Sequence, residues 1–289
     1  MTTTLQESTQ TAAHAGVGQS GLTAAAGCGV DNAALLARGL SVGYDGHQVI
    51  ENLDVAIPAG KITTIIGPNG SGKSTLLKAL AGIIPHTSGE VRIQGTALQQ
   101  LSAKKTAQTI AFLPQQPSAP EGMLGADLVA LGRHPHRSWL RQFSAEDQRI
   151  VHKVMEQTQT TEFADRPVNE CSGGQQQRLW IAMALAQSTP IVLLDEPTTY
   201  LDLAHSVSVL KLVRQLHADE GTTVCMVLHD ITLALRVSDH LIVVDDGAVV
   251  AAGAPADIMT EELLRDVFDL DAHLLPDPHH PMPVIAPVC

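Results

Sequence analysis

A glycine-rich string in the first third of the chain has the residue types and spacing of a phosphate-binding loop. Its glycines let successive backbone N–H groups face one anion, and a lysine and a hydroxyl follow them. We expect Lys73 to reach the outer phosphates of a nucleotide and the Ser74 hydroxyl to bind Mg²⁺. An ordinary glycine-rich turn is the alternative. The predicted nucleotide-binding residues of this string are Gly67, Pro68, Asn69, Gly70, Ser71, Gly72, Lys73, Ser74 and Thr75.

Two carboxylates, Asp195 and Glu196, directly follow the apolar, strand-like run 191–194. The carboxyl end of a strand is the side on which ligands bind to an open α/β sheet. We therefore expect Asp195 to share the Mg²⁺ with Ser74, and Glu196 to polarise a water that attacks the last phosphate. An exposed acidic cap on a strand is the alternative.

A histidine and a glutamine have the same placement. His229 follows the apolar run 224–228, and Gln115 ends another short apolar run. A histidine at this edge is expected to sense the last phosphate and to act with Glu196 in hydrolysis, whereas the alternative is a structural surface histidine. An amide there is able to coordinate Mg²⁺ and to report the same phosphate.

A second anion-binding end is predicted where Ser172, Gly173, Gly174 and Gln175 open a helix that runs through Gln187. Serine and glycine at a helix N-terminus leave backbone N–H groups free for an anion. One nucleotide does not need two such ends from one chain, but two chains facing head to tail would use both. The sequence therefore predicts a homodimer in which each nucleotide lies between the loop of one chain and the Ser-Gly-Gly turn of the other.

The elements that must position these residues follow from hydrophobic periodicity. A strand over 61–66 leads into the loop, and a helix is predicted over 74–81. From 173 onward helices and strands alternate, which is typical of a parallel sheet covered by helices. The predicted order is helix to 187, strand 191–194, helix 204–218, strand 222–228, helix 231–237 and strand 241–244.

The chain also divides by composition. Residues 1–32 are rich in Thr, Ala, Gly, Gln and Ser, and we expect them to be a disordered extension. Helical segments at 125–132 and 144–160 replace strand signals, so a helical subdomain is expected over about 116–172. The tail, 276–289, is rich in Pro and His and forms either a short edge strand or a frayed end.

Taken together and in order, the motifs resemble those of the ATP-binding subunits of ATP-binding-cassette (ABC) transporters. The correspondence is Tyr44 for the adenine-stacking aromatic, 67–75 for the Walker A loop, Gln115 for the Q-loop residue, 171–175 for the signature motif, Asp195 and Glu196 for the Walker B acid and catalytic base, Asp202 for the D-loop, and His229 for the switch histidine. The resemblance covers about 35–289. It implies an α/β fold class over 33–275: a P-loop NTPase cassette with a RecA-like parallel-sheet core, an antiparallel β subdomain and an inserted helical subdomain.

A finer resemblance points to the importer ATPases for iron(III)-siderophores of the ferric-enterobactin type, which are related to those for haem and cobalamin. It is carried by Leu131-Gly-Arg-His-Pro-His136, Gln177-Arg-Leu-Trp180-Ile-Ala-Met and Leu194-Asp-Glu-Pro-Thr-Thr-Tyr-Leu-Asp202. One departure is Cys171, where the family usually has Leu. Cysteine is small and partly apolar, so we expect the Ser-Gly-Gly geometry to survive.

This resemblance implies an ATP hydrolase that uses ATP and Mg²⁺ and works as a homodimer. It implies peripheral attachment to the cytoplasmic face of a bacterial inner membrane, on integral-membrane permease subunits. A solute-binding protein would take part indirectly, and no residue of this chain would contact the transported solute.

Composition excludes several other classes. Lys and Arg total 18 against 30 for Asp and Glu, which gives a net charge of −12 and argues against a nucleic-acid partner. No apolar run approaches the roughly 20 residues that cross a bilayer, and no Lys or Arg precedes Arg38 in the manner of a secretory signal. The four cysteines have no CxxC spacing, so reduced thiols are expected.

Two further functions stay open on the sequence alone. A soluble, non-transport ABC ATPase usually has two cassettes or a long coiled coil, and this chain has one cassette and no heptad run. A non-catalytic regulatory cassette conflicts with the intact Glu196 and His229.

Basic residues also gather in the expected helical subdomain, either as a solvated face or as a surface for the permease or lipid headgroups. They are Arg133, Arg137, Arg141 and Arg149.

Overall fold

The computed structural model describes residues 32–44, 46–137, 143–199 and 201–288. The expected disordered extension, Arg141 and Tyr200 lie outside the described residues, although Asn32 is described. The α-helices are α1 (Lys73–Leu80), α2 (Ala103–Ala107), α3 (Gly125–Leu131), α4 (Ala145–Gln157), α5 (Gly173–Ala186), α6 (Leu203–Glu220), α7 (Ile231–Val237), α8 (Pro255–Ile258) and α9 (Glu261–Phe268). The strands are β1 (Ala33–Tyr44), β2 (His47–Pro58), β3 (Ile62–Ile66), β4 (Ser88–Ile93), β5 (Thr96–Ala97), β6 (Ile110–Leu113), β7 (Ile191–Asp195), β8 (Thr223–Val227), β9 (His240–Asp245), β10 (Ala248–Gly253), β11 (Ala272–Leu275) and β12 (Val284–Pro287).

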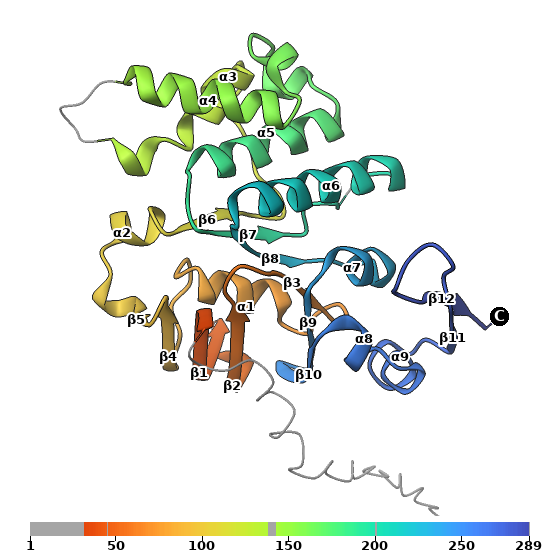
Figure 1. The fold of residues 1–289 in the computed structure, drawn as a ribbon. Coiled ribbons are helices and arrows are strands. Elements are labelled where there is room, and N and C mark those ends of the chain that lie inside the picture. The colour runs from red at the N-terminus through yellow and green to blue at the C-terminus, as the bar shows by residue number, and fades with distance from the viewer. Residues whose placement is uncertain (1–31, 45, 138–142, 200, 289) are drawn as a thin grey trace, which may run out of the picture.

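A six-stranded sheet forms the centre of the molecule, in the order β10-β9-β3-β8-β7-β6 (Figure 1). Strands β9, β3, β8, β7 and β6 run parallel to one another, and β10 is an antiparallel edge strand. Their continuous apolar runs suit strands that are covered on both faces. Because neighbouring parallel strands point the same way, β3, β8, β7 and β6 end at one edge of the sheet.

The two faces of this sheet bury two separate apolar clusters, as the period of two in a strand requires. In β7, Val192 and Leu194 pack into the cluster that also contains residues of α5 and α6. The alternate residues Ile191 and Leu193 pack into the cluster that contains residues of α1, β1 and β2. Strands β8 and β9 alternate in the same way, so the sheet is the layer that joins the two cores.

An antiparallel sheet of four strands, in the order β2-β1-β4-β5, lies on the α1 side of the central sheet. Leu76, Leu77 and Leu80 of α1 are fully buried in the cluster that this sheet shares with the central sheet. The helix that follows the glycine-rich loop is therefore enclosed between two sheets, which fixes the start of the helix relative to the loop.

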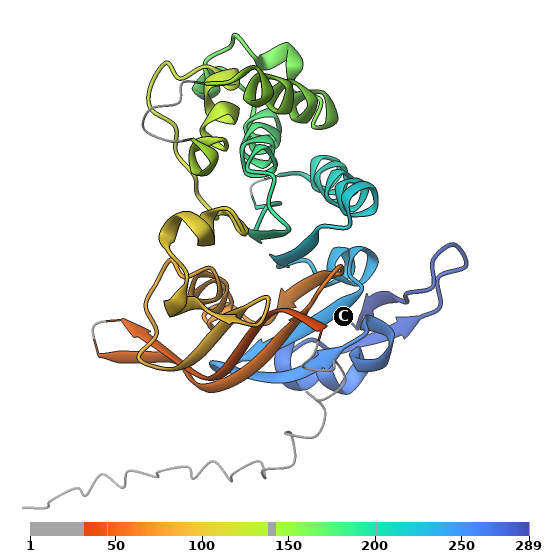
Figure 2. The same cartoon turned by 60° about the vertical axis from the view of Figure 1, so that its left-hand side comes forward.

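A helical block containing α3, α4 and most of α5 is inserted between β6 and β7, and both views place it at the opposite end from the four-stranded sheet (Figures 1 and 2). Helix α4 begins with a capping box in which Ser144 and Asp147 satisfy each other's backbone N–H groups. The parallel core, the antiparallel sheet and this helical insertion together confirm the predicted fold class.

The expectation that Arg133 belongs to an exposed basic face is wrong. Arg133 is buried and its Nε lies 2.9 Å from Asp147 Oδ1, while its Nη1 donates to the carbonyl of Ala186 at 2.6 Å. A guanidinium that is removed from water loses its hydration, and a carboxylate and carbonyl acceptors must replace it; Arg133 has both kinds of partner. Arg149, by contrast, is largely exposed beside Glu146.

The carboxyl-terminal part packs beside β9 and β10 and includes α8, α9 and a separate two-stranded sheet. Strand β12 pairs antiparallel with β11, so the tail forms the edge strand rather than the frayed end. Among the described residues no helix is long and apolar enough to cross a bilayer.

Candidate nucleotide-binding and hydrolysis site

The predicted chemical residues gather where four neighbouring parallel strands end. Gly67 follows β3, Gln115 stands two residues after β6, Asp195 is the last residue of β7, and His229 stands two residues after β8. The strand order β3-β8-β7-β6 brings these four ends side by side. Topology therefore assembles one site from segments more than 100 residues apart.

The glycine-rich loop needs glycine for two different reasons. A Cβ atom at Gly67 would lie 1.9 Å from the carbonyl oxygen of Val244, so close approach of β9 requires glycine there. Gly70 and Gly72 have φ values of 81° and 96°, in the region that side chains disfavour. Gly72 is also the N-cap of α1, so its left-handed turn aims the first N–H groups of that helix into the loop.

Lys73 is buried and bends back over the loop that precedes it. Its Nζ donates to the carbonyl oxygens of Pro68 and Gly67, at 2.6 and 3.0 Å. Burial lowers the pKa of Lys73, and the carboxylates of Glu196 and Asp195 act against that shift. The ammonium group is thus held at the centre of the loop by carbonyls that a phosphate can replace as acceptors.

Ser74 and Asp195 form a polar pair that suits a divalent cation. The Ser74 hydroxyl donates to Asp195 Oδ1 at 2.6 Å, and the other oxygen, Oδ2, is buried without a hydrogen-bond partner. Burial raises the pKa of Asp195, while Ser74 and Lys78 oppose the rise. Mg²⁺ prefers one or two such oxygen ligands together with phosphate oxygens, so these residues fit the ion. Within the described part of the chain no three His, Cys, Asp or Glu side chains form a metal cluster.

Glu196 is the centre of a compact hydrogen-bonded group. His229 Nε2 lies 2.5 Å from Glu196 Oε1, and the Gln115 side-chain amide donates to Oε2. Glu196 itself is buried and has φ 54°, a strained value for a side chain other than glycine. The predicted base, histidine and glutamine thus meet at one carboxylate. Since the Gln115 amide is engaged by Glu196, its part in binding Mg²⁺ stays a prediction.

The sequence patterns did not indicate two residues of this site, one beside Glu196 and one beside Asp195. Thr199 donates its hydroxyl to Glu196 Oε2 at 2.8 Å, and its N–H donates to the Glu196 carbonyl in a tight turn. Lys78, one helical turn after Ser74, places its Nζ 3.7 Å from Asp195 Oδ2. A hydroxyl three residues after an acid is a usable signal for the first, whereas only the packing of α1 against β7 reveals the second.

The Ser172 turn lies away from this group, at the start of α5. Ser172 and Gln175 form a capping box, and both Ser172 and Gly173 are exposed. A Cβ atom at Gly173 would meet nothing within 4 Å, so the fold itself does not require glycine there. A Cβ atom at Gly174 would lie 2.7 Å from the ring of His205.

His205 connects this turn to Asp202, the predicted D-loop residue. Asp202 is the N-cap of α6, and its Oδ1 accepts from the backbone N–H of His205 at 2.8 Å and lies 2.7 Å from His205 Nδ1. The hydrogen bond from the His205 backbone, followed by that from its ring, lowers the pKa of Asp202. Between described residues, no hydrogen bond or ion pair joins the 172–175 turn to the 67–75 loop.

Tyr44 ends β1 and is 45% exposed. The neighbouring strand β2 reaches the loop, because a Cβ atom at Gly72 would lie 3.4 Å from Val49 and Ile50. The antiparallel sheet thus borders the loop, although stacking of Tyr44 on adenine stays a prediction.

The two cysteines within the described residues, Cys171 and Cys225, are free and buried. Burial raises the pKa of both thiols. Cys171 precedes the Ser172 capping box without disturbing it, as expected.

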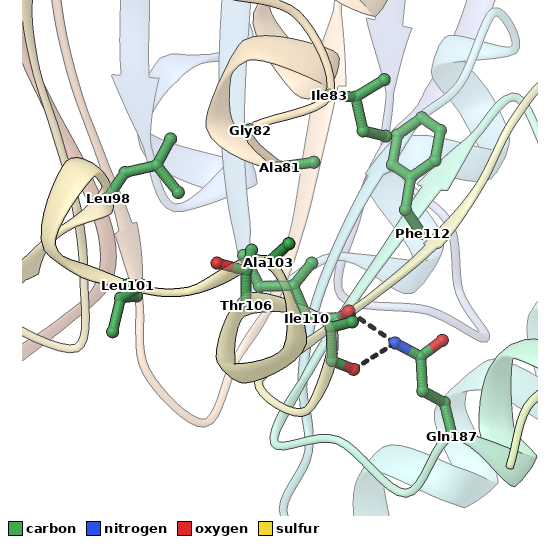
Figure 3. Close-up of a pocket in the computed structure, with 11 residues that line it drawn as sticks. Ala81, Gly82, Ile83, Leu98, Leu101, Ala103, Thr106, Ile110, Phe112 and Gln187 are labelled. Atoms are coloured by element: carbon green, nitrogen blue, oxygen red, sulfur yellow. Dashed lines mark hydrogen bonds between the residues drawn. The ribbon is translucent and has the colours of Figure 1, made fainter. Parts of the chain in front are cut away.

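A groove of about 580 Å³ lies beside β6, bordered by the end of α1, by α2 and by the end of α5 (Figure 3). Its lining is mostly apolar and includes Ile83, Leu98, Leu101 and Phe112. Ile83 is 52% exposed, so the groove opens to the surface. Gln187 closes one side of it, where its amide meets two backbone carbonyls.

Comparison with known proteins places this geometry in context. The family model described as "ABC transporter" matches residues 50–199. The achromobactin transport ATP-binding protein CbrD of Dickeya dadantii is 47% identical over 254 residues, which cover 88% of this chain and 94% of that protein. The iron(3+)-hydroxamate import ATP-binding protein FhuC of Bacillus subtilis is 45% identical, covering 85% and 91%. The cobalamin import ATP-binding protein BtuD of Halobacterium salinarum is 39% identical, covering 83% and 60%.

Solved structures show the same likeness. A protein assigned to the metal-chelate type of ABC transporter, in an inward-facing conformation, superposes with a TM-score of 0.77 and 28% identity, over 89% of this chain and 98% of that one. The bacterial ABC transporter cassette MJ0796, in a dimeric structure, gives a TM-score of 0.69 and 29% identity, over 76% and 98%. A post-hydrolysis dimer of the same cassette, bound to ADP and Pi, gives 0.68 at the same identity and coverage.

Proposed function

This chain belongs to the ABC transporter family of ATP-binding subunits, and from that premise we propose that it hydrolyses ATP to drive import of an iron(III)-siderophore complex through a membrane permease. The observation that carries the ATPase part is the meeting of His229, Gln115 and Thr199 on the buried carboxylate of Glu196, at the edge where the phosphate loop begins. The names of relatives at 45–47% identity support the siderophore part.

In the proposed hydrolysis each of these residues has a separate role. The loop N–H groups and Lys73 bind the phosphates, with Lys73 exchanging its two carbonyl acceptors for phosphate oxygens. Glu196 accepts a proton from water, whose oxygen forms a bond to the γ-phosphorus while the bond to the ADP oxygen breaks. His229 and Gln115, which hold both carboxylate oxygens here, orient Glu196. In this proposal both side chains lie beside the γ-phosphate that is transferred to water.

Ser74 and Asp195 are the residues that would hold Mg²⁺, with the side-chain amide oxygen of Gln115 as a third ligand. The ion would neutralise charge on the phosphates. Asp195 Oδ2 supports this assignment, because it accepts no hydrogen bond and the Lys78 ammonium lies 3.7 Å away, so this buried oxygen is still an available acceptor for a metal ion or a water.

The working unit in this proposal is a homodimer. The Ser172 turn is exposed, and the space around Gly173 is open on the surface, which suits the approach of a phosphate held by a second chain. ATP bridging the two chains closes the dimer, and loss of the γ-phosphate reopens it. In this arrangement Tyr44 stacks on adenine, and Ser172–Gln175 and Asp202 complete the site from the partner.

The proposed location is the cytoplasmic face of the membrane, on permease subunits that an external solute-binding protein serves. The family works with membrane permeases, and the chain's own charge of −12 does not favour anionic lipid. We take 33–275 as the cassette and about 116–172 as its helical subdomain, which passes the motion to the permease.

Cobalamin import is the second candidate, because of the similarity to the Halobacterium protein. A strain that lacks this chain and is complemented with wild type or Glu196→Gln separates the candidates. Restored uptake of radiolabelled ferric achromobactin or ferric hydroxamate by wild type alone supports the proposal. Restored uptake of cobalamin or haem instead overturns the siderophore assignment, and full uptake by Glu196→Gln overturns the catalytic one. Tight ATP binding by purified Glu196→Gln is the control for folding.

A further inference from the structure

Gln187 stands at the end of α5, opposite the Ser172 turn, and joins that helix to the central sheet. It is the C-cap residue of α5. Its side-chain amide Nε2 donates to the carbonyl oxygen of Ile110 at 2.8 Å and to that of Ala107 (Figure 3). Both N–H groups of the amide are used, and both acceptors are main-chain atoms at the start of β6 and the end of α2.

Side chains of the 131–136 segment bind the main-chain carbonyls at and before Gln187. His136 Nε2 lies 2.6 Å from the Gln187 carbonyl oxygen, and since a carbonyl only accepts, Nε2 carries the proton. Arg133 Nη1 donates to the carbonyl of the preceding residue, Ala186. The last carbonyls of a helix lack partners within the helix, and here two residues of the Gly-Arg-His-Pro-His segment supply them.

We infer that Gln187 is a positioning residue that ties the helix of the Ser172 turn to the strand of Gln115, so that both move as one unit when nucleotide binds. The 14 residues of α5 form a stiff rod of about 20 Å. At one end lies the Ser172 turn, which we have proposed to face a second chain, and at the other lies Gln187. Strand β6 has four residues and ends two residues before Gln115, whose amide holds Glu196.

This connection has a consequence for hydrolysis. The two bonds from Gln187 hold the end of α5 at the start of β6, so a shift of the helical block along α5 is also passed to the strand that leads to Gln115. The inference rests on ATP hydrolysis by this chain and is independent of the transported solute.

The test uses the full chain with Gln187→Met, which keeps side-chain length and volume but removes both donors. The matched control is Gln148→Met, at an exposed glutamine of α4 in the same helical block. For Gln187→Met we expect an ATP KM within about twofold of wild type and a kcat about tenfold lower, the range typical of coupling between sites. Gln187→Lys, whose ammonium group again offers donors to both carbonyls, is expected to recover most of the kcat.

Hydrogen exchange gives the readout that a purely structural role would not change. In wild type, addition of ATP and Mg²⁺ is expected to alter amide exchange in 67–75, 110–116 and 173–187 together. In Gln187→Met we expect ATP and Mg²⁺ still to alter amide exchange in 67–75 but no longer to alter it in 173–187. A Gln187→Met variant with the kcat of wild type and an unchanged exchange response at 173–187 would overturn the inference. A Gln187→Lys variant that folds and binds ATP but does not recover the kcat would also overturn it. A wild type without ATPase activity would instead refute the proposed function.

Discussion

The ring of His229 lies 2.5 Å from Glu196 through its Nε2 and the carboxylate Oε1, although 33 positions separate the two residues in the chain. His229 is about half exposed, whereas Glu196 is buried. The histidine therefore contacts Glu196, the proposed base, from the solvent side. Thr199 and Gln115 complete that hold at Oε2.

Thr199→Val is expected to lower kcat about tenfold with little change in the KM for ATP, because a hydrogen bond to a charged group contributes about 1.5 kcal/mol. Steady-state hydrolysis measures both constants. Thr199→Ser keeps the hydroxyl and should restore the rate. Thr198→Val, next along the same turn, is the matched control, since among the described residues no hydrogen bond from its hydroxyl is found. An equal loss in both valine variants would contradict the role of Thr199.

Arg133→Met is expected to lower the free energy of unfolding by about 3 kcal/mol, because it leaves Asp147 buried without its ion-pair partner. Urea unfolding followed by circular dichroism measures the change. Arg149→Met removes an exposed pair with Glu146 and should cost under about 1 kcal/mol. Similar losses in the two variants would mean that burial of Arg133 does not control its contribution.

Acid should weaken the fold through Asp147. The Ser144 hydroxyl, followed by Arg133, lowers the pKa of Asp147 from 3.8 to about 2. A pKa that is lower in the folded state than in the unfolded state stabilises the fold above pH 4, and that stabilisation is lost as pH falls towards 2. The difference in free energy of unfolding between wild type and Asp147→Asn should therefore shrink from pH 5 to pH 2. A constant difference over that range is the contrary result.

Gly173→Leu should abolish ATP-driven dimerisation while leaving the monomer intact. No atom lies within 4 Å of the added Cβ, so stability should change by less than about 0.5 kcal/mol. Light scattering after gel filtration, in a Glu196→Gln background with ATP, reports the dimer. Ala218→Leu, an exposed position on α6, is the control and should still dimerise. Persistence of the Gly173→Leu dimer would remove the turn from the proposed interface.

Local sequence was sufficient for the linear motifs. The loop 67–75 is recognisable because its glycines, lysine and hydroxyls lie within one short segment. The apolar runs before Asp195 and His229 predict strands, and the polar residues at the ends of those strands indicate a site. Alternation of helices and strands then fixed a parallel sheet, whose neighbouring strands end at one edge.

Only tertiary structure decided which distant groups meet. In the sequence Arg133 is one of several basic residues of the helical block and has no feature that predicts burial. In the structure the packing of α3 and α4 against the end of α5 buries it. The contacts of Lys78 with Asp195, of Gly174 with His205, and of Gln187 with β6 likewise join segments with no local signal. The physical reason is that hydrogen bonds and ion pairs depend on positions to within an ångström, and those positions are set by how the two cores pack on either face of the sheet.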